Sequence, residues 1–202
     1  MAESERFRLF IAVTLPEEVK AKIEAAQVEL RRALPGPGVR WTRREQFHLT
    51  LKFLGDVDVA RVQPLEETIR AACRGFSALQ LRAERVGFFP DLRYPRVIWA
   101  GVQDQTGQLP GLQQAVDAAT RGFTTEPKEQ RFTGHVTLAR IKAIRRPEAE
   151  ALGQAAAGLA ERLFGQWTAG EVELMRSVLS PQGARHTSLA AIPLTHSGPV
   201  LA

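Results

Sequence analysis

One short frame occurs twice in this chain and constrains its fold more than any other feature. The stretch FHLTLKFLG at residues 47–55 returns as GHVTLARI at residues 134–141. Both stretches are rich in apolar and β-branched residues, so each predicts a strand. Because successive side chains on a strand point to opposite faces, His48 and Thr50 share one face, and so do His135 and Thr137. Each copy therefore presents one imidazole and one hydroxyl on the same face of its strand.

The other face of each copy is predicted to pack against helices behind the sheet, because it carries apolar side chains. Those side chains are Leu49, Leu51, Phe53, Val136 and Leu138. Strict alternation would also turn Arg140, five residues after His135, away from the histidine face. Arg140 can reach that face only if the strand ends or twists before it.

The rest of the pattern alternates strands with helices. Strands are predicted at residues 7–14, 39–41, 47–55, 79–89, 96–102, 133–141, 172–180 and 186–194, and helices at 16–34, 59–76, 108–123 and 147–164. This order predicts an α+β fold of two related lobes within one domain spanning residues 1–202. If a pseudo-two-fold axis relates the lobes, their histidine faces meet across a central groove. The tail at about residues 195–202 is predicted to be flexible.

Composition limits the class of protein. The 202 residues include 44% apolar and 24% charged residues, as in ordinary globular domains. The formal net charge of +5 comes with far more arginine than lysine, which suits bidentate recognition of phosphate but is equally expected from codon bias. A single cysteine, Cys73, excludes an internal disulfide framework. Without a signal peptide pattern or a run of ~18 apolar residues, the chain is predicted to be cytoplasmic, with no membrane partner.

Two facing imidazoles suit paired proton transfer. With an unperturbed pKa of about 6.5, one ring can be neutral and the other cationic near neutral pH, as a general base and a general acid require. The hydroxyls of Thr50 and Thr137 can donate hydrogen bonds to phosphate oxygens. A single His-x-Thr in a strand is more often a half-buried structural histidine. Packing gives no reason to repeat the imidazole in register, so the duplication favours catalysis.

The repeated frames and their surroundings resemble the two-histidine (2H) phosphoesterases, and among them the RNA 2′,3′-cyclic phosphodiesterases, also called 2′-5′ RNA ligases. The resemblance extends from RLFIAVTLP through FHLTLKFLGDV, RVIWAGV and GHVTLARI to SVLSPQGARHTSL. It implies a bilobal fold with two antiparallel sheets and outer helices around a central groove. It also implies a set of site residues: His48 and His135 as the catalytic pair, Thr50 and Thr137 as phosphate ligands, and Arg140 and Arg185 as further contacts to the substrate.

The reaction that this resemblance implies is the opening of a terminal RNA 2′,3′-cyclic phosphate to a 2′-phosphomonoester, without a metal or other cofactor. RNA ends of this kind, or cyclic nucleotides, are the expected partners, and the chain is expected to be a monomer. As a hypothesis, His135 acts as the base and His48 as the acid, although the sequence does not distinguish the two roles. With an RNA 5′-hydroxyl in place of water, the reverse reaction would form a 2′-5′ linkage.

Other interpretations remain open at this stage. The groove could hold RNA ends without turning them over, or act on ADP-ribose cyclic phosphate or 2′,5′-oligonucleotides. A purely structural duplication would leave the two histidines apart. A metal site is disfavoured because neither H-x-H nor H-E-x-x-H spacing occurs. The basic segment VRWTRRE at residues 39–45 is either a guide for RNA or a solvated turn with Trp41 in the core.

Overall fold

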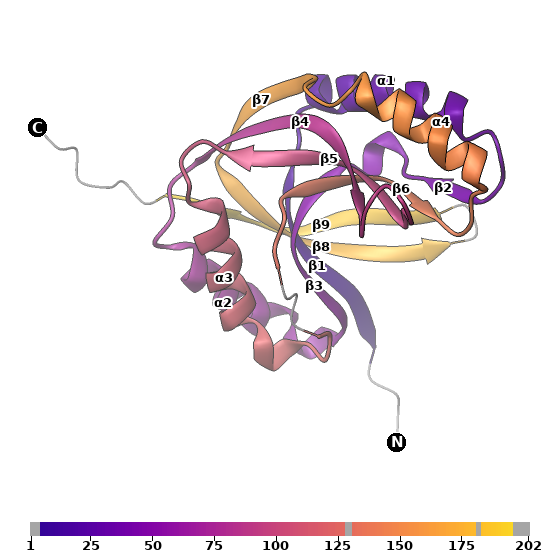
Figure 1. Ribbon diagram of the computed structural model, residues 1–202. Coiled ribbons are helices and arrows are strands. Elements are labelled where there is room, and N and C mark those ends of the chain that lie inside the picture. Colours follow the sequence, from indigo (N-terminus) through magenta and orange to yellow (C-terminus); the bar gives the residue numbers. More distant parts are fainter. Residues whose placement is uncertain (1–4, 128–130, 181–182, 196–202) are drawn as a thin grey trace, which may run out of the picture.

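The computed structural model describes residues 5–127, 131–180 and 183–195 and contains two antiparallel sheets. The four-stranded sheet has the order β3-β1-β8-β9 (Figure 1). Its strands are β1 (Arg6–Thr14), β3 (His48–Asp58), β8 (Glu171–Ser180) and β9 (Gly183–Pro193). The first and last parts of the chain therefore meet in one sheet.

The five-stranded sheet has the order β2-β6-β5-β4-β7. Its strands are β2 (Val39–Trp41), β4 (Leu79–Phe89), β5 (Val97–Asp104), β6 (His135–Ile141) and β7 (Leu163–Ala169). The middle of the chain forms most of this sheet, and β2 joins it from the N-terminal part by pairing with β6.

Two pairs of helices cover the sheets (Figure 1). The helices are α1 (Glu17–Ala33), α2 (Val62–Cys73), α3 (Leu109–Ala119) and α4 (Arg146–Ala157). Short 3-10 turns lie at Arg44–Gln46, Val59–Arg61 and Arg121–Phe123. Helices α1 and α4 contact each other, and α1 also contacts β7, whereas α2 contacts β9 and α3 contacts β3. Within the described ranges, no helix has both the length and the apolar character needed to cross a bilayer.

The α+β, bilobal architecture predicted from the sequence is confirmed. The lobes are not, however, the two halves of the chain. Helix α1 follows β1 of the four-stranded sheet but packs on the other lobe, and β8 and β9 return to the first lobe at the end of the chain. The exchange ties the lobes together, because each sheet needs strands from distant parts of the chain to complete its pairing.

The predicted helix at 147–164 is wrong in its second half. Helix α4 ends at Ala157, Gly158 follows as its cap, and the unpredicted strand β7 begins at Leu163. The Ala-rich segment continues the helical pattern, but pairing with the open edge of β4 satisfies the backbone of β7 and buries Phe164. Residues 181–182, between the predicted strands at 172–180 and 186–194, and most of the predicted tail, residues 196–202, lie outside the described residues.

Candidate active site

The two histidines occupy equivalent positions, since each is the first residue of its strand. The ring Nδ1 of His48 lies 2.7 Å from the backbone oxygen of Gln46, and Nδ1 of His135 lies 2.7 Å from that of Thr133. A carbonyl oxygen can only accept a hydrogen bond, so Nδ1 carries the proton in both rings. Nε2 of each ring is therefore left to give or take a proton.

A cleft of about 400 Å³ lies between the two sheets beside His48. Its walls come from both lobes, with Thr50 on β3 and Thr137 on β6. The lining residues are Arg8, Phe10, Arg40, Trp41, Thr42, Gln46, His48, Thr50, Phe53, Thr137, Arg140, Ser177, Leu179, Ala184 and His186. His135 is not among them, but it lies two residues before Thr137, and its charge is near enough to help lower the pKa of His48. The structure thus brings the two predicted frames together.

A β-bulge turns Arg140 into the cleft. Strand β5 pairs Ile98 with Ala139 but Trp99 with Thr137, so Leu138 is an extra residue in β6. Both Leu138 and Ala139 are fully buried, and alternation resumes one position later. This twist meets the condition under which Arg140 can share the face of Thr137, and Arg140 lines the cleft.

The same bulge occurs in β3, and it corrects the prediction for Phe53. Strand β1 pairs Ile11 with Lys52 but Ala12 with Thr50, so Leu51 is the extra residue, at the position equivalent to Leu138. Phe53 was expected to point to the helices, but it lines the cleft and is 36% exposed. Each histidine is thus followed, five residues later, by a side chain that the bulge returns to the cleft.

The surroundings of His48 disfavour its charged form. Burial, the largest cause, acts together with the charges of nearby His186, His135 and Lys20 to lower its pKa from 6.5 to about 4, while the hydrogen bond to the backbone of Gln46 acts in the opposite direction. His48 is therefore neutral at neutral pH in the free protein. Burial also lowers the pKa of His186.

His186 is a third histidine that lines the cleft. Its ring centroid lies 5.4 Å from that of His48 and 4.9 Å from that of Phe10, edge-on to both. Arg185 is exposed on β9 and is not among the cleft-lining residues, because alternation on this strand sends Ala184 and His186 inward. The structure therefore does not bring Arg185 to the other predicted site residues.

The basic segment at residues 39–45 divides between the cleft and the surface. Arg40 and Trp41 line the cleft. Arg44 points elsewhere and pairs with Glu17 at 3.0 Å. Arg40 pairs in register with Arg140 across β2 and β6, so two guanidinium groups reach the cleft from neighbouring strands.

Several cleft residues were missed from the sequence, mainly Arg8, Gln46, Ser177 and Leu179. They come from three separate segments, and Arg8, Ser177 and Leu179 lie beside His48 only because β1 pairs with both β3 and β8. Arg8 and Phe10 lie two residues apart on β1, so alternation could have placed them on one face once Phe10 was known to line the cleft. Within the described ranges, no group of three or more His, Cys, Asp or Glu residues is arranged to hold a metal ion.

Comparison with known proteins gives consistent matches. The family described as "LigT like Phosphoesterase" matches this chain over residues 13–99 and again over 101–186, so each matched segment contains one histidine frame. A protein of Methanothermobacter thermautotrophicus named RNA 2′,3′-cyclic phosphodiesterase is 30% identical over 191 residues, covering 94% of this chain and 100% of the relative. A relative of the same name from Thermus thermophilus is 31% identical over 193 residues, covering 93% of this chain and 90% of the relative.

Solved structures share the fold. A crystal structure of a Thermus thermophilus protein superposes with a TM-score of 0.74 at 30% identity and covers 93% of this chain and 97% of that one. Escherichia coli LigT in complex with 3′-AMP superposes with a TM-score of 0.73 at 24% identity, covering 95% and 100% of the two chains. The two sheets and four helices are thus a shared architecture.

Proposed function

The chain belongs to the LigT-like phosphoesterase family, and on this premise we propose that it hydrolyses terminal RNA 2′,3′-cyclic phosphates to 2′-phosphomonoesters. Relatives that match over most of their length are named RNA 2′,3′-cyclic phosphodiesterases. The observation that carries the proposal is the arrangement of the two His-x-Thr frames. The frames lie at one cleft on strands of different sheets, and in both histidines Nδ1 is hydrogen-bonded to a backbone carbonyl oxygen.

The chemical step needs one proton acceptor and one proton donor. Water attacks phosphorus, its proton passes to a neutral imidazole, the bond from phosphorus to O3′ breaks, and the second imidazole protonates O3′. The lowered pKa of His48 favours it as the acceptor, which leaves His135 as the donor. This assignment reverses the hypothesis drawn from the sequence. The Nδ1 hydrogen bonds hold both rings so that Nε2 carries out the transfer.

The cleft is suited to an anion. Its lining includes the guanidinium groups of Arg8, Arg40 and Arg140, and within the described residues no carboxylate lines it. Two hydroxyls, those of Thr50 and Thr137, stand in the walls from opposite sheets. Donors of this kind stabilise the charge that develops on the phosphoryl oxygens in the transition state, and the guanidinium groups can bind those oxygens in pairs.

Replacing each catalytic histidine tests the proposal. We expect His48→Asn and His135→Asn each to lower hydrolysis of 2′,3′-cyclic nucleotides by about 10²- to 10⁴-fold, because each removes one proton transfer. An asparagine amide can still donate a hydrogen bond to the carbonyl that holds the ring, which protects the fold. As a matched substitution in the same cleft, His186→Asn should cost less than about tenfold, since it carries out no proton transfer.

The reaction product separates the alternatives. A 2′-phosphomonoester from the parent protein, identified by chromatography against both isomers, supports the proposed step. If the parent binds RNA with a cyclic phosphate end but yields no product, the protein is an RNA-end-binding module instead. If either histidine variant keeps activity within about tenfold of the parent, the assignment of the pair is wrong.

A further inference from the structure

A second, larger groove of about 1340 Å³ opens at one end of the five-stranded sheet. It is lined by the β4–β5 loop at residues 92–96, the β6–α4 connection at 141–145, and one side of α4. Strands β4 and β6 both end here, and β5 and α4 both begin here (Figure 1). The groove does not belong to the cleft that holds His48.

The two cavities are adjacent through the backbone. Arg140, which lines the cleft, pairs with Val97 across β6 and β5. The next residues, Ile141 and Lys142, line the groove. The amide of Ile141 donates to the backbone oxygen of Arg96 at 2.8 Å, and the guanidinium of Arg96 donates to the backbone oxygen of Lys142 at 2.8 Å. The lining of the groove therefore begins one residue after Arg140, the last residue of β6 that lines the cleft.

The groove is strongly basic. Five cationic side chains line it, against a single carboxylate: Arg93, Arg96, Lys142, Arg145 and Arg146, against Glu150. Arg146 is paired with Glu150 at 3.0 Å, and Arg145 is paired with Glu148. Within the described chain, Arg93, Arg96 and Lys142 form no ion pair with an acidic side chain. Three cations are thus left to attract a polyanion.

An exposed aromatic ring stands among these cations. Tyr94 is 65% exposed, and the guanidinium of Arg93 lies 5.4 Å from its ring centroid. The loop that presents Tyr94 is held by the carboxylate of Asp91, which accepts from the amides of Arg93 and Tyr94 at 2.8 and 3.0 Å. A ring presented in this way can stack on a base that has left its strand.

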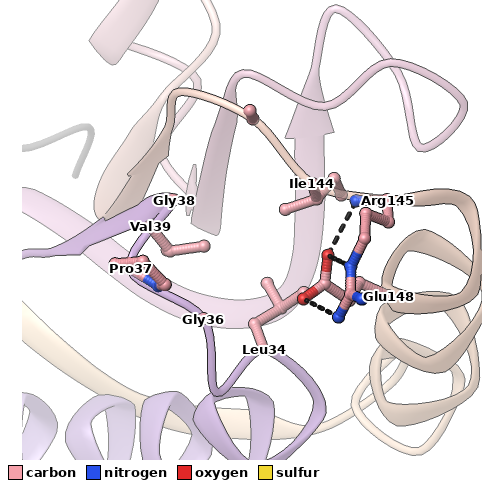
Figure 2. A pocket seen from close by; sticks show the side chains of 9 residues that line it. Leu34, Gly36, Pro37, Gly38, Val39, Ile144, Arg145 and Glu148 are labelled. Carbon is pink, nitrogen blue, oxygen red and sulfur yellow. Dashed lines mark hydrogen bonds and ion pairs between the residues drawn. The ribbon is translucent and has the colours of Figure 1, made fainter.

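A neighbouring pocket has a different character. It is lined by Leu34, Gly36, Pro37, Gly38, Val39, Ile144 and other residues, and its one cation, Arg145, is turned to Glu148 (Figure 2). Because Glu148 neutralises Arg145 there, this pocket offers no free charge to a phosphate. The polyanion site is therefore restricted to the side of Arg93, Arg96 and Lys142.

We propose that this groove binds the RNA strand on the 5′ side of the terminal cyclic phosphate, with its phosphodiesters against Arg93, Arg96 and Lys142 and a base stacked on Tyr94. The inference rests on the proposed function, since it assigns the strand that continues from the nucleotide in the cleft. It makes RNA oligonucleotides, rather than mononucleotides, the preferred substrate class. Single-stranded nucleic acids are bound in this way elsewhere, by cations along the backbone and aromatic rings under the bases.

The experiment compares two substrates and five proteins. The substrates are a 2′,3′-cyclic mononucleotide and a short single-stranded RNA that ends in the same cyclic nucleotide. The proteins are the parent, the double variant Arg93→Ala/Lys142→Ala, the single variants Tyr94→Ala and Tyr94→Phe, and a control that removes the exposed Arg74 at the end of α2 (Arg74→Ala), on the other pair of helices. Binding is measured separately, with RNA that ends in the 2′-phosphate product.

We expect the parent to have a lower KM for the oligonucleotide than for the mononucleotide. The double variant should bind product RNA about tenfold more weakly, and the slope of log affinity against log salt should fall by about 1.4, at ~0.7 for each lost phosphate contact on a single strand. Tyr94→Ala should weaken binding by at least about fivefold, and Tyr94→Phe should restore it, because stacking needs the ring and not the hydroxyl. All groove variants should hydrolyse the mononucleotide like the parent.

Different results overturn the two proposals. If the parent does not hydrolyse the mononucleotide, the proposed function fails. If the mononucleotide is hydrolysed but the groove variants match Arg74→Ala in oligonucleotide affinity, KM and salt slope, the groove does not bind the RNA strand. An equal loss in the groove variants and in Arg74→Ala would likewise overturn the site, because it would show only an effect of total charge.

Discussion

Lowering the pH should destabilise the fold through His48, and the size of the effect follows from its surroundings. In the unfolded chain this histidine has its usual pKa of 6.5, whereas burial holds the pKa in the folded protein at about 4. Between these values the unfolded state binds more protons than the folded state. The free energy of unfolding therefore falls as pH falls from about 6.5 to about 4 and is unaffected by this group at higher pH. A difference of about 2.5 in pKa corresponds to about 3 kcal/mol.

The perturbation is His48→Asn, which removes the titrating group and keeps a donor for the carbonyl of Gln46. We expect the parent to lose about 3 kcal/mol more than the variant between about pH 7.5 and about pH 4. Urea denaturation followed by circular dichroism measures both proteins at both pH values, and urea is preferred because it adds no salt to screen the cleft charges. Carboxylates elsewhere titrate equally in both proteins and cancel in the difference.

Other charged groups around His48 also affect its pKa, and through it the pH dependence of the free energy of unfolding. Besides burial, the charges of His186, His135 and Lys20 lower the pKa of His48 and so favour its neutral form. If the parent and His48→Asn lose the same free energy of unfolding over this pH range, within about 0.5 kcal/mol, then His48 is not desolvated as described. The assignment of His48 as the proton acceptor would then lose its physical basis.

Three further outcomes are expected. Lys52 and Asp117 form a buried ion pair at 2.6 Å, and Arg121 lies 4.0 Å from the other carboxylate oxygen of Asp117. Lys52→Met should therefore lower the free energy of unfolding, measured by urea denaturation, by about 3–5 kcal/mol, because it leaves the carboxylate buried without its partner. Adding Asp117→Leu should recover most of this loss. Arg140→Ala should lower kcat/KM for cyclic nucleotides by about 10- to 100-fold, with Arg140→Lys between the two, because a lysine keeps the charge but loses bidentate contact. Excess EDTA should leave turnover unchanged, since every step of the proposed reaction uses side chains alone; loss of activity that zinc or magnesium restores would contradict this.

The regular strands and helices could be predicted from the sequence because their patterns are local. The strand that begins at His48 and the one that begins at His135 were both predicted within two residues of their starts. Strand β7 could not be predicted in this way, because its extended conformation depends on pairing with β4 about eighty residues away in the chain. The same limit applied to the exchange of helix α1 between lobes, since the sequence of an amphipathic helix does not say which sheet it covers.

The bulges show a different limit. Alternation holds up to Leu51 and Leu138, which are buried as predicted, and it fails at the next residues, Lys52 and Ala139, which are buried as well. A prediction that alternates side chains strictly between the two faces of a strand does not allow for an inserted residue. It therefore assigns every side chain after a bulge to the wrong face. In the structure, two adjacent buried residues in each strand mark the inserted position. The sequence does not reveal it, because Leu-Lys in the first copy and Leu-Ala in the second are not recognisable as pairs of buried residues. Lys52 in particular is buried only because it pairs with Asp117.

The proposed acid and base roles of the two histidines depend on residues outside the repeated frame. The frame makes the rings alike, since each donates Nδ1–H to a backbone oxygen two residues earlier. Acid and base catalysis nevertheless require them to differ. The rings next to His48 are those of Phe10 and His186, whereas His135 lies against Phe89 and Trp99. The imidazole of His186 opposes protonation of His48. The phenyl ring of Phe89 and the indole ring of Trp99, beside His135, carry no titrating charge. Burial is the largest cause of the lowered pKa of His48, and strand β9, which comes from the far end of the chain, adds the charge of His186 to it.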